Sequence, residues 1–292
     1  MLLPKFDFHE PATIAEACAM MTEFNTKAKV LAGGTDLMVN MKKKLLSPQY
    51  LVSISRIEEL KKLEATPQGV TIGSCVTVAD IAASKVVGKS WSALCAGAGA
   101  LGSPLVRNLA TIGGNIGSAR PAADLPPSLI AYGARVVLKK KGSERAVPMD
   151  RFFLGVGLTQ IAPEEILTEI QIDTPPPYSG AGYINEGIRT CQDCNVVNVA
   201  SFITLDGPDG VIKDARIVMG CVGPTHLRAG SAEKLLIGEK PTEDIFAKAG
   251  EAATKDCSPI DDVRGSALYK KNMVSVLTKR TLGIALNQAM GK

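Results

Sequence analysis

Two short segments with paired glycines constrain this chain more than any other feature of its sequence. They read Ala32-Gly33-Gly34-Thr35-Asp36 and Thr111-Ile112-Gly113-Gly114-Asn115, and each comes with a short run of strand character, at 28–31 and 109–112. Adjacent glycines allow the backbone to adopt positive φ and to turn several N–H groups toward one point. Such a concave set of donors suits a phosphate. We therefore expect the two segments to lie together and to hold the two phosphates of a dinucleotide from opposite sides.

The composition is that of a globular protein and argues against several classes of function. The 292 residues are 46% hydrophobic and 21% charged, which leaves room for two domains. Aromatic residues make up only 4% of the chain. Because proteins that stack on nucleic-acid bases use exposed aromatic side chains, we expect no nucleic-acid partner. No apolar stretch approaches the roughly 20 residues of a membrane span, and residues 1–7 lack the features of a signal peptide. Seven cysteines without regular spacing are typical of reduced thiols, which predicts a cytoplasmic location.

A run of three prolines, at 175–177, predicts the boundary between two domains, because it can neither continue a helix nor donate ladder hydrogen bonds. Before it, residues 1–177 divide into a small α/β unit at about 1–55 and a second unit at 56–177. After it, residues 178–292 predict three strands followed by helices. We expect these strands at 182–189, 196–205 and 211–222, and the helices near 231–236, 242–255 and 266–290. Strands followed by helices indicate an α+β fold with a three-stranded antiparallel sheet and a helical bundle.

Local patterns predict the elements of the first domain. Thr13 is a candidate cap for a helix whose apolar face uses Ile14, Ala17, Cys18 and Met21. Strands are expected at 30–32, 50–54 and 70–72, and helices at 78–83 and 91–98. Two prolines, at 126 and 127, fit the first turn of a further helix that reaches about residue 132. Residues 135–140 and 145–147 indicate a hairpin that turns at 142–143.

One rival motif runs from Gly97 to Gly102 and reads G-x-G-x-x-G, with Asp124 at about the distance that a Rossmann fingerprint requires. That fingerprint must follow a strand and begin a helix. Here the preceding residues have helical composition, and Pro104 interrupts the stretch where the helix should run. We therefore expect these glycines to end a helix and to let the chain pass close to a flat ring.

The remaining chemical signals are weak. Cys191 and Cys194 form a lone C-x-x-C pair without further ligands, so strand cysteines are expected, with redox sensitivity or a partner-facing role left open. His9 and His226 stand apart from any nucleophile or carboxylate. The sequence predicts no catalytic side chain and no metal site. A flavin fits this pattern, because the protein has only to bind and orient a cofactor that carries its own chemistry.

Longer stretches around both glycine pairs carry a family resemblance. The residues VLAGGTDLMVNMK (30–42) and GSPLVRNLATIGGNIGSARPAADLPPSLIA (102–131) resemble the flavoprotein (medium) subunit of the molybdenum hydroxylases. That family includes xanthine dehydrogenases, nicotinate dehydrogenase and aerobic carbon monoxide dehydrogenase. The resemblance extends to EILTEI (165–170), to Arg189 and Asp193, and to GCVGPTHLRAGSAEKLLIG (220–238), and so covers nearly the whole chain.

The resemblance implies a two-part FAD-binding domain of the PCMH type, similar to that of vanillyl-alcohol oxidase, and a C-terminal domain of the CO dehydrogenase flavoprotein type. It implies non-covalent FAD, with the pyrophosphate on the two glycine segments. Asp124 matches an acidic residue that contacts the cofactor, Leu101 a residue beside the flavin ring, and Leu167 a backbone position at the flavin edge. The full set of matching positions is Val30, Leu31, Ala32, Gly33, Gly34, Thr35, Asp36, Leu37, Leu101, Thr111, Ile112, Gly113, Gly114, Asn115, Asp124 and Leu167.

By the same resemblance, the chain is an electron-transfer subunit. It would receive electrons from 2Fe–2S clusters in a small subunit, while a large subunit holds the molybdopterin, in a dimer of heterotrimers. NAD(P)+ or another acceptor would take the electrons onward. Related chains carry a lysine shortly before Arg189, whereas this chain has Asn185 and Glu186 there, which weakens the case for nicotinamide. Two alternatives stay open, a free-standing FAD-dependent oxidase or dehydrogenase and a scaffold subunit without flavin.

Overall fold

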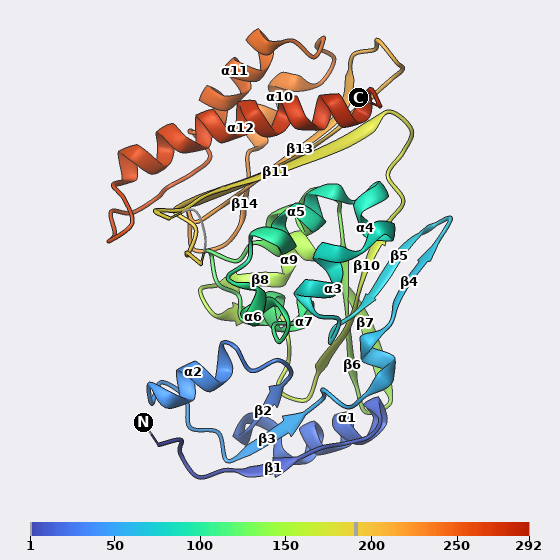
Figure 1. Cartoon of the computed structure of the whole chain (residues 1–292), viewed down its shortest axis with the longest axis vertical. Coiled ribbons are helices and arrows are strands. Elements are labelled where there is room, and N and C mark those ends of the chain that lie inside the picture. Colours follow the sequence, from blue (N-terminus) through green and yellow to red (C-terminus); the bar gives the residue numbers. More distant parts are fainter. Residues whose placement is uncertain (1, 190–191, 292) are drawn as a thin grey trace.

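The N-terminal unit is a small parallel sheet with helices at its edges. The computed structural model describes residues 2–189 and 192–291, and Figure 1 shows the unit at one end of the elongated molecule. Its sheet has the order β1-β3-β2, with β1 at Asp7–His9, β2 at Ala28–Leu31 and β3 at Tyr50–Ser53. Helix α1, Ile14–Phe24, begins at Thr13, whose side chain accepts a hydrogen bond from the backbone of Glu16. Helix α2, Leu37–Lys42, follows β2 through the first glycine segment, and a 3-10 turn covers Asn25–Lys27.

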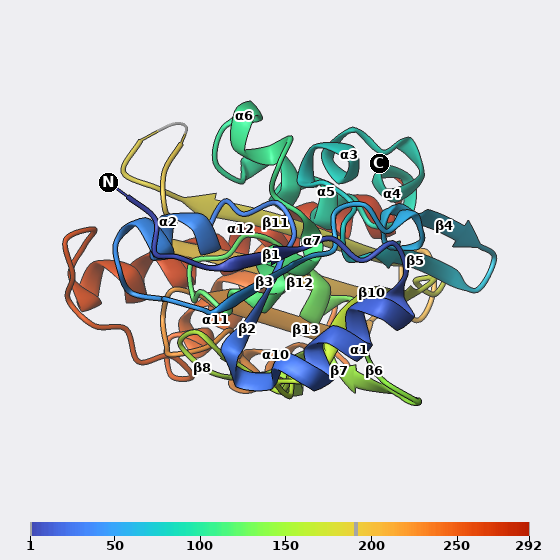
Figure 2. The same ribbon diagram turned by 90° about the horizontal axis from the view of Figure 1, so that it is seen from below.

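The second unit is built on a five-stranded antiparallel sheet with the order β4-β5-β10-β6-β7. Its strands are β4 (Leu63–Thr66), β5 (Gly69–Gly73), β6 (Arg135–Lys140), β7 (Ser143–Pro148) and β10 (Ile166–Asp173). A 3-10 turn, Glu58–Lys61, precedes β4, and a small hairpin joins β8 (Phe153–Gly155) to β9 (Leu158–Thr159). Seen from below, α1 lies alongside β10 and the β6–β7 hairpin, so the two units pack directly on each other (Figure 2).

Short helices cover one face of this sheet and carry the second glycine segment. They are α3 (Val78–Ala83), α4 (Lys85–Ser90), α5 (Ser92–Ala100), α6 (Pro104–Arg107), α7 (Ile112–Gly117), α8 (Leu125–Ala131) and α9 (Met149–Phe152). Their apolar side chains form one buried core with the sheet, and Ile72, Leu94, Ile112 and Leu129 are completely buried in it. The segment with the second glycine pair is therefore fixed by the core rather than by an exposed loop.

The C-terminal domain is an antiparallel sheet covered on its outer face by helices (Figure 1). The sheet has the order β11-β12-β13-β14, with β11 at Ser179–Glu186, β12 at Val197–Leu205, β13 at Ile212–Gly220 and β14 at Leu227–Arg228. Helices α10 (Gly230–Leu236), α11 (Glu243–Ala253) and α12 (Ala267–Ala289) form the outer layer. The inner face packs on α5 and α8, because Tyr183 and Phe202 belong to the same buried core as Leu129.

The structure confirms most predicted elements and corrects others. The α+β class, the Thr13-capped helix, the hairpin at 135–147, the three long C-terminal strands and the three terminal helices are all present. The two-residue strand β14 adds a fourth strand to the predicted three. The strand predicted at 109–112 is wrong, because only Thr111 forms an isolated bridge there, to Thr77, and a helix then begins at Ile112.

Candidate cofactor site

The first glycine segment connects β2 to α2 and presents unused hydrogen-bond donors. Gly34 has φ of 71°, a conformation that L side chains rarely adopt, and it turns the chain toward the helix. In the part of the chain that the structure describes, the backbone N–H groups of residues 32–36 donate to no protein acceptor. A run of unpaired N–H groups ahead of a helix is a ready site for an anion.

The second glycine segment differs, because its N–H groups are already bonded within the protein. Thr111 caps α7, and its Oγ1 accepts from the N–H of Gly114 at 3.1 Å. The N–H groups of Ile112 and Gly113 donate to the carbonyls of Val76 and Ser74 at 3.0 and 2.9 Å. The glycine at 113 is required by close packing, since a Cβ there would lie 2.6 Å from the Cβ of Ser74. The expected concave set of free donors is thus present in the first segment and absent from residues 112–114.

Side chains around α7 nevertheless offer polar atoms to a ligand. The Oδ1 atom of Asn115 and the Oγ atom of Ser74 are buried and have no partner among the described residues. Buried polar atoms normally find partners, so each orphan calls for an explanation such as a bound ligand or water. The Asn115 carboxamide is therefore a candidate to contact a ligand at this segment.

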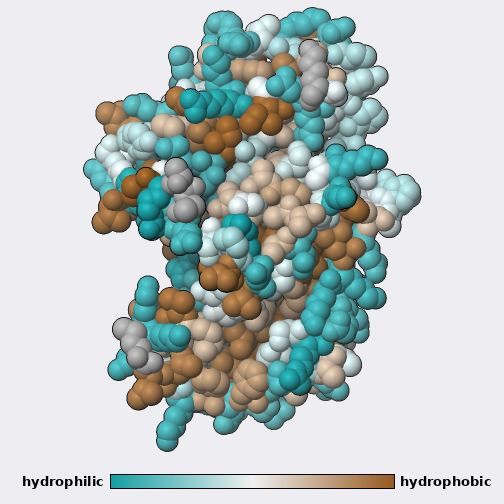
Figure 3. Space-filling model, viewed as in Figure 1, coloured by the Kyte–Doolittle hydropathy of each residue, from teal (hydrophilic) through white to brown (hydrophobic). Residues whose placement is uncertain are grey.

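The fold brings the two glycine segments together, as their sequences predict. A Cβ at Gly33 would overlap the carbonyl of Leu109, so the first segment passes directly against the residues that lead into Thr111. Beyond α7, a guanidinium nitrogen of Arg120 lies 3.6 Å from Oδ2 of Asp36, so an ion pair joins the first segment to the residues that follow α7. In the space-filling view, the outline of the molecule is indented on this side, between the N-terminal unit and the C-terminal domain (Figure 3).

Of the positions expected beside the flavin, Leu167 is linked to the second segment by backbone hydrogen bonds. The N–H of Gly113 donates to Ser74, and the N–H of Ser74 donates to the carbonyl of Thr168 at 2.9 Å, so Leu167 on β10 is tied to the second segment. The pairing of β10 with β6 shifts register between Leu167 and Glu169. A bulge of this kind redirects backbone groups and is common beside functional sites. Leu101 ends α5 and is 8% exposed.

Asp124 is held in a buried polar cluster that joins the two domains. Its Oδ1 accepts from the hydroxyl of Tyr183 at 2.9 Å and from Nδ2 of Asn195 at 2.7 Å. Asn198 donates to the Tyr183 hydroxyl at 3.2 Å and to the carbonyl of Ala123 at 3.0 Å. Burial raises the pKa of the Asp124 carboxyl, and the bonds from Asn195 and Tyr183 act against that rise. We define Asp124, Tyr183, Asn195 and Asn198 as the interdomain polar cluster.

The other motifs carry no chemistry in the structure. Residues Gly97 to Ala100 lie within the C-terminal half of α5 instead of opening a helix, so the Rossmann interpretation is excluded. Cys191 lies outside the described residues, while Cys194 is exposed. His226 is buried against Phe153, and burial lowers its pKa to about 4. Among residues 2–189 and 192–291, no cluster of three or more His, Cys, Asp or Glu side chains could hold a metal.

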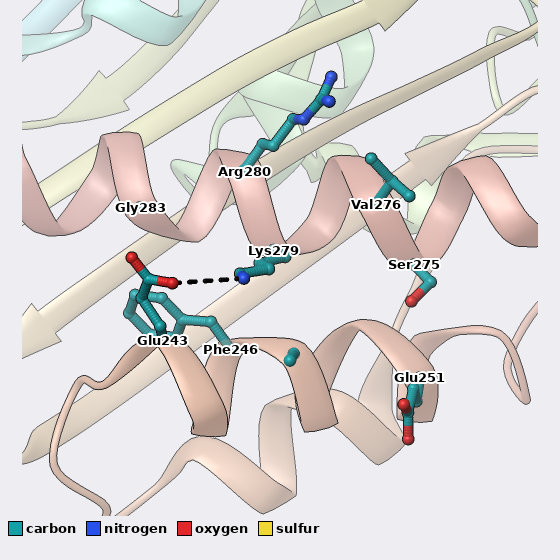
Figure 4. Close-up of a pocket in the computed structure, with 9 residues that line it drawn as sticks. Glu243, Phe246, Glu251, Ser275, Val276, Lys279, Arg280 and Gly283 are labelled. Atoms are coloured by element: carbon teal, nitrogen blue, oxygen red, sulfur yellow. Dashed lines mark hydrogen bonds and ion pairs between the residues drawn. The ribbon is translucent and has the colours of Figure 1, made fainter.

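A separate groove of about 520 Å³ lies between α11 and α12 on the outer layer. Figure 4 shows Phe246 and Val276 along it, with the ion pair from Lys279 to Glu243 at one side. Helices α11 and α12, whose residues line the groove, lie on the side of the C-terminal sheet away from α2 and α7 (Figure 1). The groove therefore contributes nothing to the cofactor site. Within the described part of the chain, no helix is long and apolar enough to cross a membrane.

Comparisons with known proteins assign the chain to a family. Residues 4–175 match the FAD-binding domain in molybdopterin dehydrogenase, and residues 183–285 match the CO dehydrogenase flavoprotein C-terminal domain. The carbon monoxide dehydrogenase medium chain of Hydrogenophaga pseudoflava is 33% identical over 286 residues, which cover 98% of both chains. The xanthine dehydrogenase FAD-binding subunit of Escherichia coli O157:H7 is 27% identical and covers 98% of this chain and 99% of its own.

Solved structures agree with this assignment. A carbon monoxide dehydrogenase chain from Hydrogenophaga pseudoflava superimposes with a TM-score of 0.93 at 34% identity and covers 98% of both chains. A chain of quinoline 2-oxidoreductase from Pseudomonas putida 86 gives a TM-score of 0.92 at 25% identity, covering 99% of this chain and all of that one. The chain therefore belongs to the FAD-binding flavoprotein subunits of the molybdenum hydroxylases, a family of oxidoreductases.

Proposed function

We propose that this chain binds FAD non-covalently and serves as the electron-transfer subunit of a molybdenum hydroxylase complex. The observation that carries the proposal is the run of unpaired N–H groups at residues 32–36, placed against the segment that begins at Thr111. The chain also offers the orphaned Oδ1 of Asn115 and the carboxylate of Asp124. Bound FAD supplies the capacity to accept electrons singly and to release them as a pair.

The protein's own part is to bind and orient the cofactor. The unpaired N–H groups of residues 32–36 would donate hydrogen bonds to the pyrophosphate, whose negative charge suits such donors. Neither glycine segment contains a histidine or cysteine that could form a covalent flavin link. The further positions proposed for FAD contact are those of the matching set, including Leu101 beside the ring and Leu167 at its edge. We also propose that the boundary between the two domains lies at residue 177, and that residues 1–177 contain two units, at about 1–55 and 56–177.

Partner subunits complete the proposed activity. By analogy with the family, we propose that a small subunit holds the 2Fe–2S clusters and a large subunit holds the molybdopterin. Among the described residues of this chain, no group of three or more His, Cys, Asp or Glu side chains could hold a metal. Exposed apolar side chains on α6 and directly after it favour contacts with such subunits, since Leu105 is 79% exposed and Leu109 is 61% exposed. We propose a dimer of heterotrimers in the cytoplasm, with NAD(P)+ or another compound as the final electron acceptor.

Acid precipitation tests the cofactor part of the proposal. All flavin should appear in the supernatant as FAD. Flavin that stays with the pellet, or FMN in the extract, contradicts it. The purified chain should not oxidise a heterocycle, an aldehyde or carbon monoxide until the other two subunits are added, and turnover by the chain alone would instead support a free-standing oxidase.

Rapid mixing of the reduced whole complex with candidate acceptors tests the last step. Reoxidation by NAD+ or NADP+ supports electron transfer to nicotinamide. Reoxidation by quinone or ferredoxin alone rules that acceptor out and leaves the FAD assignment intact. The test matters here because Asn185 and Glu186 stand where related chains carry a lysine.

A further inference from the structure

The carboxylate of Asp124 is held on one side only. Both described hydrogen bonds to it reach Oδ1, from Tyr183 on β11 and from Asn195 just before β12. Oδ2 has no hydrogen-bond partner among the described residues, and it is not fully buried. One oxygen is therefore fixed by the C-terminal domain, and the other is left to accept a further hydrogen bond.

The two donors are themselves fixed by further bonds. Asn198 donates to the hydroxyl of Tyr183, so that hydroxyl is left to donate to Asp124. The Oδ1 atom of Asn195 accepts from Nδ2 of Asn185 at 2.9 Å, which orients the Asn195 amide with its nitrogen toward the carboxylate. A carboxylate that accepts two oriented donors is favoured in its ionised form.

Among the described residues, no other charged group shifts the pKa of the Asp124 carboxyl. Burial raises the pKa of the Tyr183 phenol well above its ordinary value, and it raises that of Cys221 to about 12. Burial lowers the pKa of His226, beyond the end of β13, to about 4. All three groups are neutral near pH 7, so none of them brings a charge beside the Asp124 carboxyl.

Two cations lie beyond this shell. Arg264 and Lys270 are close enough to Cys221 to lower the pKa of its thiol. Lys270 is itself bound to the carbonyl of Ile260 and to Asp262, at 2.8 and 3.0 Å. Neither cation is bonded to Asp124, whose described partners are Tyr183 and Asn195.

We infer that Tyr183 and Asn195 of the C-terminal domain are positioning residues for FAD, holding Asp124 so that its free oxygen accepts a hydrogen bond from an O–H or N–H group of the cofactor. The inference rests on the proposed function and adds to it a role for the second domain. FAD affinity then depends on two side chains that act through Asp124 rather than on the cofactor directly.

A simpler role for the same cluster is to join the two domains, and the experiment separates the two roles. Tyr183→Phe and Asn195→Ala each remove one donor to Asp124. The matched control is Tyr132→Phe, which removes another buried hydroxyl, one that accepts from the N–H of Ala93 at 3.3 Å and does not contact Asp124. For each full-length variant, the dissociation constant of FAD is measured by fluorescence quenching from about pH 5 to 8, and Tm is measured without FAD.

The inference predicts that both variants weaken FAD binding about tenfold, the usual effect of losing a hydrogen bond to a charged group. Removal of a donor raises the pKa of Asp124, and the protonated carboxyl is the poorer acceptor. The loss of FAD affinity on acidification should therefore begin at higher pH in both variants than in the wild type. In Asp124→Asn the position no longer titrates, and this pH dependence should disappear. Tyr132→Phe should lower Tm but change FAD affinity by less than about twofold.

Unchanged FAD affinity in both variants, with only a lower Tm, would overturn the inference while the wild type still binds FAD. Equal weakening by Tyr132→Phe would do the same. A wild-type chain that binds no FAD would overturn the proposed function as well. If Tyr183→Phe fails to fold, Asn195→Ala alone decides, because Asn195 lies outside both strands.

Discussion

The two glycine segments are similar in sequence, but their backbone N–H groups differ in hydrogen bonding. The N–H groups of residues 32–36 have no protein acceptor in the part of the chain that the structure describes, whereas those of residues 112–114 donate hydrogen bonds to Val76, Ser74 and Thr111. The pair at 113–114 lies in the first turn of a helix that packs against Ser74. Paired glycines therefore indicate that the backbone passes close to another group. Only the tertiary structure shows whether that group is a ligand or another part of the protein.

The largest effect is expected at Gly33. A Cβ there would overlap the Leu109 carbonyl, so Gly33→Ala must push the first segment away from the residues that lead into Thr111. We expect FAD to be lost from the purified protein, together with about 1–3 kcal/mol of the free energy of unfolding. Flavin content and urea unfolding measure the two effects. A Gly33→Ala protein with full flavin content would show that the junction of the two segments is unimportant for binding.

Gly113→Ala should act mainly on stability. The added Cβ meets the Cβ and carbonyl of Ser74 at 2.6 and 2.8 Å, so α7 must shift on the core. We expect a loss of about 1–3 kcal/mol in unfolding free energy, with a smaller loss of FAD affinity than in Gly33→Ala. Gly114→Ala is the matched control, because its Cβ meets only Oγ1 of Thr111 at 3.0 Å and alanine favours the helix. If both alanines cost the same stability, the packing explanation for Gly113 is wrong.

Thr111→Val should have an intermediate effect. It keeps the shape of the side chain but removes the Oγ1 atom that caps α7 by accepting from Gly114. Loss of such a cap costs about 1 kcal/mol, and it frees one N–H group in the second segment. Thermal unfolding without FAD measures the cost, and Thr111→Ser, which keeps the hydroxyl, should recover most of it. Equal destabilisation by serine and valine would show that the cap is not what stabilises this turn.

The smallest effect is expected at Asp36. Its ion pair with Arg120 joins the first segment to the residues that follow α7, but both side chains are nearly half exposed, at 49% and 46%. Exposed pairs contribute less than about 1 kcal/mol and are screened by salt. Asp36→Asn should therefore change stability by a few tenths of a kcal/mol at low salt and by nothing measurable at high salt. A loss above about 1 kcal/mol that persists in high salt would mean that the pair is more than a surface contact.

Much of the fold could be predicted because its signals are local. Thr13 with the apolar spacing behind it specifies α1, and prolines 126 and 127 fit the start of α8. The local signals did not predict strand β10. It lies at the centre of the sheet of the second unit, where it pairs with both β5 and β6. The strand predicted at 109–112 failed because Thr111 is bonded as a helix cap rather than as part of a ladder.

Some residues of the candidate site could likewise be predicted from the sequence, and others could not. The glycine segments are found from short motifs, which also predict that the segments meet, whereas Asp124 is proposed only through the family resemblance. The interdomain polar cluster could not be found from spacing, because Asn195 reaches Asp124 and Asn198 reaches Tyr183 only once β11 and β12 pair in the folded domain. The available signal was two asparagines within the apolar run at 194–200, where a polar side chain needs a buried partner.

Amide hydrogen exchange with and without FAD tests the central claim most directly, since it reports on individual N–H groups in both segments. Without FAD, the amides of residues 32–36 should exchange rapidly and those of 112–114 slowly, because only the latter are bonded within the protein. With FAD, the amides of 32–36 should become strongly protected while those of 112–114 change little. Protection confined to 112–114, or no change at 32–36 under conditions where FAD is bound, would contradict the account.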